Sequence, residues 1–357
     1  MGDLFEIEST LSFNSDRLVS GDEYDYVTRT SLNQGILQTT GFVNKENINP
    51  VGTWSLGLLQ MDFFYRNKPW YAGQFVRRIV PKISIPDGAI LFFQTLLNMQ
   101  KQILLQVLVR HVDETFRNIV VTLPTTAKNE IDFDFMESFI REIEEKNMRK
   151  LSAYLATTGL SDYTLTNAER SALKSFDDMQ WEEFRMGNLF DRVGTKKLPY
   201  KAGELPKEPV AEYTLPCLTS SFNNQGLNYY ASREGATILK NVITIPSNSD
   251  VYRAYYQSRD FTVLSDAYAI KWIFDNKDMD SKQYLFVVPC INMVTDLSIY
   301  SYKNKLGGWN VVKDKFILLP VKDGKPDYDT MGTFISAIQK LVIKDVVLYA
   351  NKKIASV

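Results

Sequence analysis

DFDFMESFI at residues 132–140 returns as DYDTMGTFI at residues 327–335, so the chain contains one motif twice. Asp, an aromatic residue, Asp, Met, Phe and Ile stand in register at an offset of 195 positions. The same offset pairs Leu151 with Val346 and Tyr154 with Tyr349, so the similarity continues beyond the motif. Self-similarity at a fixed spacing indicates that a structural unit is duplicated.

The first copy, Asp132–Tyr154, has the pattern of a helix. We expect Asp134 to cap it and Glu137 to complete an acidic capping box. Apolar residues follow at three- and four-residue steps, and the other side carries mixed charges. Two such helices are expected to bury their apolar stripes against each other. The expected packing residues are Met136, Ile140, Ile143, Leu151 and Tyr154 in the first helix and Met331, Ile335, Ile338, Val346 and Tyr349 in the second.

Composition restricts the class of protein. The chain has 357 residues, of which 45% are hydrophobic, and this favours two or three folded domains over disorder. A net charge of -1 gives no general attraction to nucleic acid, so DNA binding would need local patches. Two cysteines exclude a disulfide framework, and we expect a cytoplasmic protein. No signal peptide or membrane span is predicted.

The region before the first helix is predicted to be β-rich, with strands within Tyr24–Thr30, Trp54–Tyr65 and Ile119–Leu123. Its short motifs return with small insertions. A linker, Thr158–Gln180, carries a capping box from Thr166 to Glu169 that predicts a short helix. The recurring motifs are Gly2–Phe5 with Gly187–Phe190, Asn33–Gly35 with Asn224–Gly226, Tyr65 with Tyr256, Leu97–Met99 with Ile291–Met293, and Pro124 with Pro320.

These repeats predict an α+β protein of two tandem β-rich modules, each followed by a long helix. Similar units in tandem are expected to pack with approximate two-fold symmetry. The predicted boundaries are 1–131 for the first module, 132–180 for the first helix and linker, 181–326 for the second module and 327–357 for the second helix. Trp181–Phe184 has no equivalent in the first unit, because Met1 aligns with Met186.

Catalytic and metal-binding motifs are missing from the sequence. The only histidine, His111, is interpreted as a surface or packing residue, and the cysteines lack zinc-ligand spacing. No phosphate-binding glycine loop or nucleophile elbow occurs. The pairs Asp132/Asp134 and Asp327/Asp329 could act as acid and base, but their place at helix starts favours capping. We expect no catalytic residue, metal or cofactor.

Two polar loops and two basic segments are the candidates for DNA binding. Arg can pair with guanine, and Asn or Gln with adenine, in the major groove. Asn-Gln-Gly is also turn chemistry, and this alternative stays open. Lysines and arginines would supply phosphate contacts. The candidates are Arg29, Thr30, Asn33, Gln34, Arg66, Lys68, Arg77 and Arg78 in the first module and Thr219, Ser221, Asn224, Gln225, Lys303 and Lys305 in the second.

The order of these motifs, given twice, resembles the DNA specificity subunit of type I restriction-modification systems and the similar subunit of type IIB systems. The resemblance rests on Gly2–Phe5 and Gly187–Phe190, on Phe261–Ile270, on the Asn-Met segments and on Lys315–Val321, which leads into a helix. It covers essentially the whole chain. It implies that each module is a target recognition domain reading half of a split site in double-stranded DNA. It also implies an antiparallel coiled coil that sets the gap between the halves.

The resemblance further implies docking to methyltransferase subunits and, in a full complex, to a restriction motor. The helix length agrees with the spacing role, because 23 residues span roughly 35 Å, about one turn of B-DNA.

Two other functions stay open. One is a carboxylate-based hydrolase that uses Asp132 and Asp327 between the duplicated halves, and the other is a coiled-coil adaptor that binds no DNA.

Overall fold

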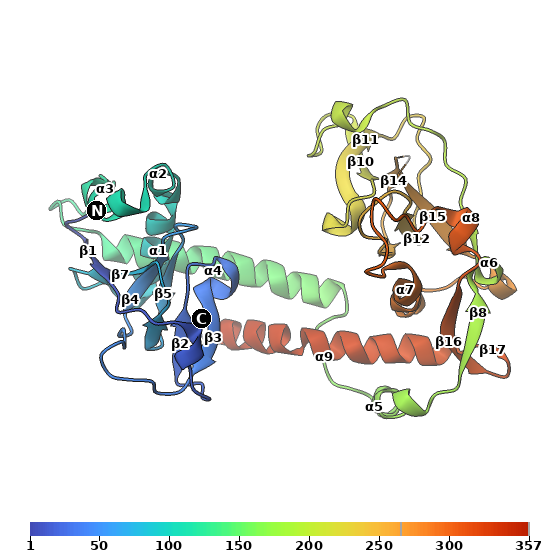
Figure 1. The fold of residues 1–357 in the computed structure, drawn as a ribbon, viewed down its shortest axis with the longest axis horizontal. Coiled ribbons are helices and arrows are strands. Elements are labelled where there is room, and N and C mark those ends of the chain that lie inside the picture. The colour runs from blue at the N-terminus through green and yellow to red at the C-terminus, as the bar shows by residue number, and fades with distance from the viewer. Residues whose placement is uncertain (265, 356–357) are drawn as a thin grey trace. The chain divides into compact units, whose positions relative to one another are not determined.

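The computed structural model describes residues 1–264 and 266–355 and divides the chain into two units, Met1–Leu151 and Ser152–Val357 (Figure 1). Ser265, part of the Phe261–Ile270 motif, and the last two residues of the expected 327–357 region lie outside the described residues. Helices and sheets are mixed in both units, so the expected α+β class is confirmed.

The first unit consists of short strands followed by helices. Its strands are β1 (Phe5–Ser9), β2 (Tyr24–Val27), β3 (Ile36–Thr40), β4 (Thr53–Gly57), β5 (Phe63–Arg66), β6 (Trp70–Ala72) and β7 (Val76–Pro81). Its helices are α1 (Ile90–Met99), α2 (Lys101–Leu104), α3 (Val112–Asn118) and α4 (Phe133–Thr157), whose last residues belong to the second unit.

The second unit repeats this order with additions at both ends. Its strands are β8 (Trp181–Arg185), β9 (Phe190–Arg192), β10 (Tyr213–Leu218), β11 (Leu227–Ser232), β12 (Val242–Pro246), β13 (Tyr255–Gln257), β14 (Thr262–Val263), β15 (Ala267–Trp272), β16 (Phe316–Lys322) and β17 (Lys325–Pro326). Its helices are α5 (Asn167–Lys174), α6 (Met186–Leu189), α7 (Ser281–Thr295), α8 (Trp309–Val312) and α9 (Tyr328–Ala355).

The two units share their sheet topology and their register. An antiparallel sheet of order β1-β7-β4-β5 corresponds to β9-β15-β12-β13. A second sheet, β3-β2-β6, corresponds to β11-β10-β14, and in each the middle strand runs parallel to the last one. Tyr26 pairs with Tyr71 in the first unit, and Cys217 pairs with Thr262 in the second, both 191 positions later. The duplication predicted from the sequence is therefore confirmed at the level of individual strand pairs.

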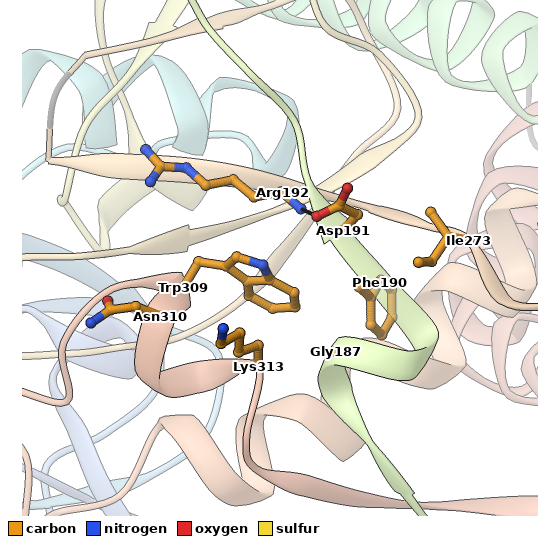
Figure 2. A pocket seen from close by; sticks show the side chains of 8 residues that line it. All are labelled: Gly187, Phe190, Asp191, Arg192, Ile273, Trp309, Asn310 and Lys313. Carbon is orange, nitrogen blue, oxygen red and sulfur yellow. Dashed lines mark hydrogen bonds between the residues drawn. The ribbon is translucent and has the colours of Figure 1, made fainter.

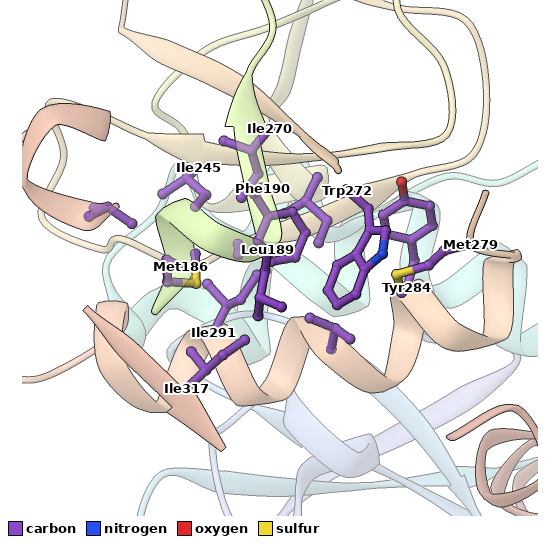
Figure 3. Close-up of a cluster of buried hydrophobic side chains, with 14 of the residues drawn as sticks. Met186, Leu189, Phe190, Ile245, Ile270, Trp272, Met279, Tyr284, Ile291 and Ile317 are labelled. Carbon is purple, nitrogen blue, oxygen red and sulfur yellow. The ribbon is translucent and has the colours of Figure 1, made fainter. Parts of the chain in front are cut away.

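Each unit buries an apolar core between its four-stranded sheet and the helices that follow it. In the second unit Leu189, Phe190, Ile270 and Trp272 meet Ile291 of α7 (Figure 3). The first turn of each long helix joins the core of its own unit. Met136 of α4 packs with the first core and Met331 of α9 with the second, and both are fully buried.

Met136 and Met331 were predicted to pack the two long helices against each other. They are instead buried in the cores of their own modules. The positions further along the helices face outward more. Ile143, Tyr154, Val346 and Tyr349 are exposed, whereas Ile140, Leu151, Ile335 and Ile338 are half-buried. Their role in pairing α4 with α9 stays a prediction.

One aspartate lies at the junction between each module and its long helix. The N–H of Asp132 donates to the carbonyl of Pro124 at 3.0 Å, and its Oδ1 accepts the N–H of Phe135 at 2.9 Å. Asp327 repeats both bonds in the second unit, with Pro320 at 2.8 Å and Thr330 at 3.0 Å. The capping residue is therefore Asp132, and the expectation that Asp134 caps the helix is wrong. Asp134 lies in the first turn, where its charge suits the helix dipole.

The predicted strand at Ile119–Leu123 does not form. Its equivalent in the second unit, β16, pairs with β8. Among residues 1–264 and 266–355 no strand pairs with Ile119–Leu123, and the amino group of Met1 bonds the carbonyl of Ile119, where the second unit has the peptide N–H of Met186. Val120 is 93% exposed. A strand needs a neighbour for its backbone groups, so this segment stays irregular.

An asparagine in each unit holds the edge of the sheet against the following helix. The Oδ1 of Asn98 accepts the N–H of Phe63 at 2.9 Å, and its Nδ2 donates to the carbonyl of Phe63 at 2.9 Å. Asn292 makes the same two bonds with Ala254, at 2.7 and 3.3 Å. These are the asparagines of the repeated Asn-Met motif, which gives that motif a structural explanation.

Within the second unit the linker helix α5 lies against α9. The predicted capping box is confirmed, because Thr166 and Glu169 exchange the two expected bonds. The Nζ of Lys340 donates to the carbonyl of Thr164 at 2.9 Å and lies 3.1 Å from carboxylate oxygens of both Asp162 and Glu169. Phe176 stacks on Phe334 with ring centroids 4.7 Å apart. The linker is thus fastened to the helix by charge and by ring packing.

We predict that Asn98→Ala and Asn292→Ala each lower the free energy of unfolding by about 1–3 kcal/mol, because each leaves a buried peptide N–H and C=O without a partner. Urea denaturation of the full chain measures this loss. Asn228→Ala, at an exposed position of β11, should stay within about 0.5 kcal/mol of wild type. Asparagine variants as stable as this control would contradict the structural role.

Acid is predicted to loosen the linker from α9. Burial raises the pKa of the Glu169 carboxyl, but hydrogen bonds from Thr166 and Lys340 outweigh it and lower the pKa to about 2. A depressed folded-state pKa means that the contribution is complete above the unfolded pKa of about 4.3 and is lost as pH falls toward 2. Limited proteolysis of residues 158–180 should therefore accelerate below about pH 4.

Two glutamine variants provide the comparison for this acid effect. Glu169→Gln should be cleaved faster than wild type already at neutral pH, with a smaller acid response. Glu182→Gln, at an exposed position on β8, should behave like wild type. An acid response of wild-type size in Glu169→Gln would place the titrating group elsewhere.

Candidate nucleic-acid interface

The two polar loops predicted from the sequence have the same conformation. Asn33 and Gln34 lie in the left-handed region at φ/ψ of 46/45° and 54/32°, and Asn224 and Gln225 at 46/38° and 55/32°. The glycine that follows each pair also has a positive φ. Each loop is closed by a backbone bond, from Thr28 N–H to the Gly35 carbonyl and from Thr219 N–H to the Gly226 carbonyl, at 2.8 and 2.9 Å. The interpretation of Asn-Gln-Gly as a turn is confirmed, and the turn presents exposed side chains.

The glycine at the end of each loop has a positive φ and little free space where a side chain would begin. A Cβ on Gly35 would lie 3.3 Å from the guanidinium of Arg66 and 3.3 Å from the carbonyl of Thr28. A Cβ on Gly226 would lie 3.3 Å from the carbonyl of Thr219. A left-handed backbone is unfavourable for non-glycine residues, so a run of three left-handed residues, two of them not glycine, needs support from its surroundings.

The tips of both loops are open to solvent. Asn33 and Gln34 are exposed, as are Asn224 and Gln225, and each loop also carries an uncovered apolar residue, with Leu32 78% and Phe222 52% exposed. Amide side chains can recognise adenine in a groove, and apolar ones can contact a thymine methyl group. The two tips differ in sequence around the shared Asn-Gln.

The hydroxyl candidates near the loops have structural duties. Thr30 Oγ1 accepts the N–H of Leu32 at 3.1 Å, and Ser221 Oγ accepts the N–H of Asn223 at 3.1 Å. Thr219 Oγ1 accepts the N–H of Ser221 at 3.2 Å. These local bonds rigidify each loop from within.

Contacts with the neighbouring strands hold the loops from outside. The guanidinium of Arg29 lies 5.3 Å from the ring centre of the exposed Phe75, and Ser31 donates to Asp62, which pairs with Lys101 at 2.5 Å. In the second unit Ser249 donates to the carbonyl of Ser220 at 2.9 Å, and Tyr255 donates to that of Phe222 at 3.1 Å. Arg29 is exposed, so it can reach a partner in solution.

Most of the basic residues predicted to contact DNA in the first module are already paired. Arg77 binds Asp113 through both carboxylate oxygens at 3.0 and 3.1 Å, and Arg78 binds Glu8 at 2.9 Å. Lys68 lies 3.6 Å from Asp25. The sequence showed the arginines and lysines but could not show these carboxylates, which come from other segments. Phosphate contacts by these three side chains stay a prediction.

Arg66 is a correction to the predicted contacts. Its side chain points inward from β5, and the residue is only 2% exposed, so it cannot contact a phosphate without unfolding its surroundings. Lys303 and Lys305 are in the opposite situation, because both are exposed. In the described part of the chain neither has an ion-pair partner, and Lys305 Nζ lies 4.6 Å from the ring centre of Tyr302.

A depression of about 580 Å³ with a mixed polar and apolar lining, in the second unit, was not predicted (Figure 2). It lies between β9 and α8 and contains Arg192, Lys313 and Asp191. The equivalent charges in the first unit, Glu6 and Arg117, are within 3.5 Å of each other.

The side chains that could act in catalysis lie apart from one another or already make structural hydrogen bonds. His111 is exposed and accepts a hydrogen bond from Arg110, and Asp132 and Asp327 cap their helices. Within residues 1–264 and 266–355, no cluster of three or more His, Cys, Asp or Glu could hold a metal ion. In the same residues no helix combines the length and apolar character needed to cross a bilayer.

The chain thus has two like modules, each with a polar loop held by local hydrogen bonds and each continued by a long helix. Residues 1–153 match the family model for the type I restriction modification DNA specificity domain. This match covers the first unit, and the chain is similar to specificity subunits of restriction-modification systems.

Known proteins resemble the chain over nearly its whole length. The specificity subunit S.BcgI of a type II restriction enzyme from Heyndrickxia coagulans is 21% identical over 322 residues, which cover 89% of this chain and 86% of that protein. The S subunit of a type I restriction-modification system from M. genitalium has a similar fold, with a TM-score of 0.53 at 12% identity over 99% of this chain and 91% of that one. The HsdS subunit from Thermoanaerobacter tengcongensis aligns over 98% and 91% at 10% identity, with a TM-score of 0.33.

Proposed function

We propose that the protein is a non-catalytic DNA-recognition scaffold in which each module reads one half of a bipartite site. The observation that carries this proposal is the matching conformation of the two exposed Asn-Gln loops. Two equal reading heads on one chain suit a site with two separated halves. The differing residues around the shared Asn-Gln allow the halves to differ in sequence.

The long helices are proposed to set the distance between the half-sites by pairing as an antiparallel coiled coil. α4 has 25 residues and α9 has 28, which correspond to roughly 38 and 42 Å at about 1.5 Å per residue. This is close to the ~34–36 Å of one DNA turn, the spacing at which two heads can read one face. We retain the four-part division at 1–131, 132–180, 181–326 and 327–357 as part of this proposal.

The partners in this proposal are double-stranded DNA, methyltransferase subunits and, in some assemblies, a restriction motor, all in the cytoplasm. The chemistry would then belong to the partners. Asp132 and Asp327 are used as helix caps, which removes the support for a hydrolase built on them. The alternative of an adaptor that binds no DNA does not explain the exposed amide-bearing loops.

Methylation mapping of a genome that carries this protein with its neighbouring methyltransferase tests the function directly. The expected result is methylated adenine in two short half-sites separated by a constant gap, and loss of that methylation when this chain is deleted. Methylation that persists without the chain, or that follows one uninterrupted site, would contradict the proposal. Purified single chain is expected to show neither cleavage nor methylation.

Base-reading side chains should act on one half-site only. Asn33→Ala is predicted to relax one half of the site, and Asn224→Ala the other half, each by about 10- to 100-fold in discrimination, because a paired amide–adenine contact contributes ~1–3 kcal/mol. Arg29→Ala should act on the same half as Asn33→Ala. The measurement is methylation of a library of randomised sites. Equal relaxation of both halves by any of these changes would contradict the modular assignment.

Lysines that bind phosphates should affect all sequences alike. Lys303→Gln with Lys305→Gln is predicted to weaken binding uniformly and to reduce the slope of log K against log salt by about 1 for each phosphate that is no longer bound. Fluorescence anisotropy of the methyltransferase complex on cognate and random duplexes gives both quantities. Lys128→Gln, an exposed lysine outside the proposed interface, is the control. A change in sequence preference in the double variant would contradict a phosphate role.

A further inference from the structure

We call the two Asn-Gln loops, residues 28–35 and 219–226, the recognition loops. In each unit one side chain donates a hydrogen bond to the equivalent backbone carbonyl of its recognition loop. In the first unit Arg66 Nη2 donates to the carbonyl of Gln34 at 2.6 Å. In the second unit Gln257 Nε2 donates to the carbonyl of Gln225 at 3.1 Å. Arg66 ends β5, and Gln257 ends β13 at the equivalent position, 191 residues later. The accepting carbonyls belong to the second left-handed residue of each loop.

The same two side chains are also fastened to a hydroxyl on the neighbouring strand. Arg66 bonds Ser55 Oγ through Nε at 3.0 Å and through Nη2 at 2.6 Å. Gln257 Nε2 bonds Thr244 Oγ1 at 3.1 Å. Ser55 and Thr244 are both buried, in β4 and β12. Each loop carbonyl is therefore tied through one side chain to the interior of its sheet.

A buried arginine with no carboxylate in direct contact is costly, so its presence needs an explanation. Among the described residues Arg66 has no ion pair, and burial lowers the pKa of its guanidinium to about 10 although the charge of Asp25 raises it. The rings of Phe64 and Trp70 lie 5.8 and 6.0 Å from it. An apolar side chain of similar volume would often be at least as stable there. The second unit places an uncharged glutamine in the same role, so the shared element is the donated hydrogen bond.

We propose that Arg66 and Gln257 are positioning residues that hold the two recognition loops in their reading conformation and so determine the fidelity of their own half-sites. This inference rests on the proposed function. The donated bond fixes the peptide between Gln34 and Gly35, and its equivalent in the second unit, in the left-handed arrangement. When that peptide is held, the side chains of Asn33 and Gln34 project from their loop in a fixed direction. The same applies to Asn224 and Gln225 in the second loop.

The test compares three substitutions of Arg66 in the complete complex with its methyltransferase. Arg66→Met keeps the volume and removes every donor. Arg66→Gln introduces the side chain that the other unit uses. Arg66→Lys keeps the charge but removes the planar donor group. We expect Arg66→Met to reduce discrimination at least 10-fold at one half-site and to keep the other half-site intact, and Arg66→Gln to recover most of that discrimination.

Hydrogen exchange measured by mass spectrometry on residues 28–36 reports the loop without reference to DNA. Arg66→Met should exchange faster there, and Arg66→Gln should exchange at nearly the wild-type rate. Arg117→Met also removes an arginine of the first unit, one that lies outside the loop, and it should change neither readout. If Arg66→Met loosens the loop but the wild-type complex shows no bipartite methylation, the proposed function is wrong. The role of Arg66 in holding the loop would still stand.

The second unit provides an independent test if Arg66 variants fold poorly. Gln257→Glu keeps size and shape but replaces the donating amide by an acceptor, so it should loosen residues 219–227 and relax only the other half-site. The proposal is overturned if Arg66→Met and Gln257→Glu keep full half-site fidelity. It is also overturned if either substitution degrades both half-sites equally, since that would indicate a general loss of structure.

Discussion

Each long helix is fixed to its module by one aspartate that uses its backbone and its side chain together. The N–H of Asp132 reaches back to Pro124 in the module, and its carboxylate holds the first turn of α4. Asp327 does the same between Pro320 and α9. One turn further on, Met136 and Met331 are buried in the cores of their modules. The direction in which each helix leaves its module is determined at this junction, and any spacing function of α4 and α9 depends on it.

The duplication and the helix starts could be predicted from the sequence because they leave periodic or repeated signals. Turn chemistry at Asn33 and Asn224 was also accessible, since Asn-Gln-Gly favours positive φ. Two predictions about local structure were wrong for related reasons. Asp134 stands in a capping pattern, but Asp132 has the bond to Pro124 that fixes the cap. Ile119–Leu123 has strand composition, but a strand also requires a partner.

The basic residues of the first module show why the candidate site was harder to predict than the fold. A count of charges cannot distinguish an arginine that faces solvent from one that faces the sheet. Arg66 faces inward at the end of β5, and Arg77 and Arg78 find carboxylates from α3 and β1. The repeat nevertheless held a usable signal. Arg66 aligns with Gln257 at the offset of 191, so the property that the two positions share is a side-chain N–H donor and not a charge.

The bonds that shape each recognition loop all originate within the same unit. Ser55, Arg66 and Asp62 serve the first loop, and Thr244, Gln257 and Ser249 serve the second. A genetic exchange that joins one unit of this chain to a unit from a relative would therefore transfer a loop together with its complete support. Under the proposed function, such an exchange would give a new combination of half-sites in a single recombination event, without any adjustment in the unit that is retained.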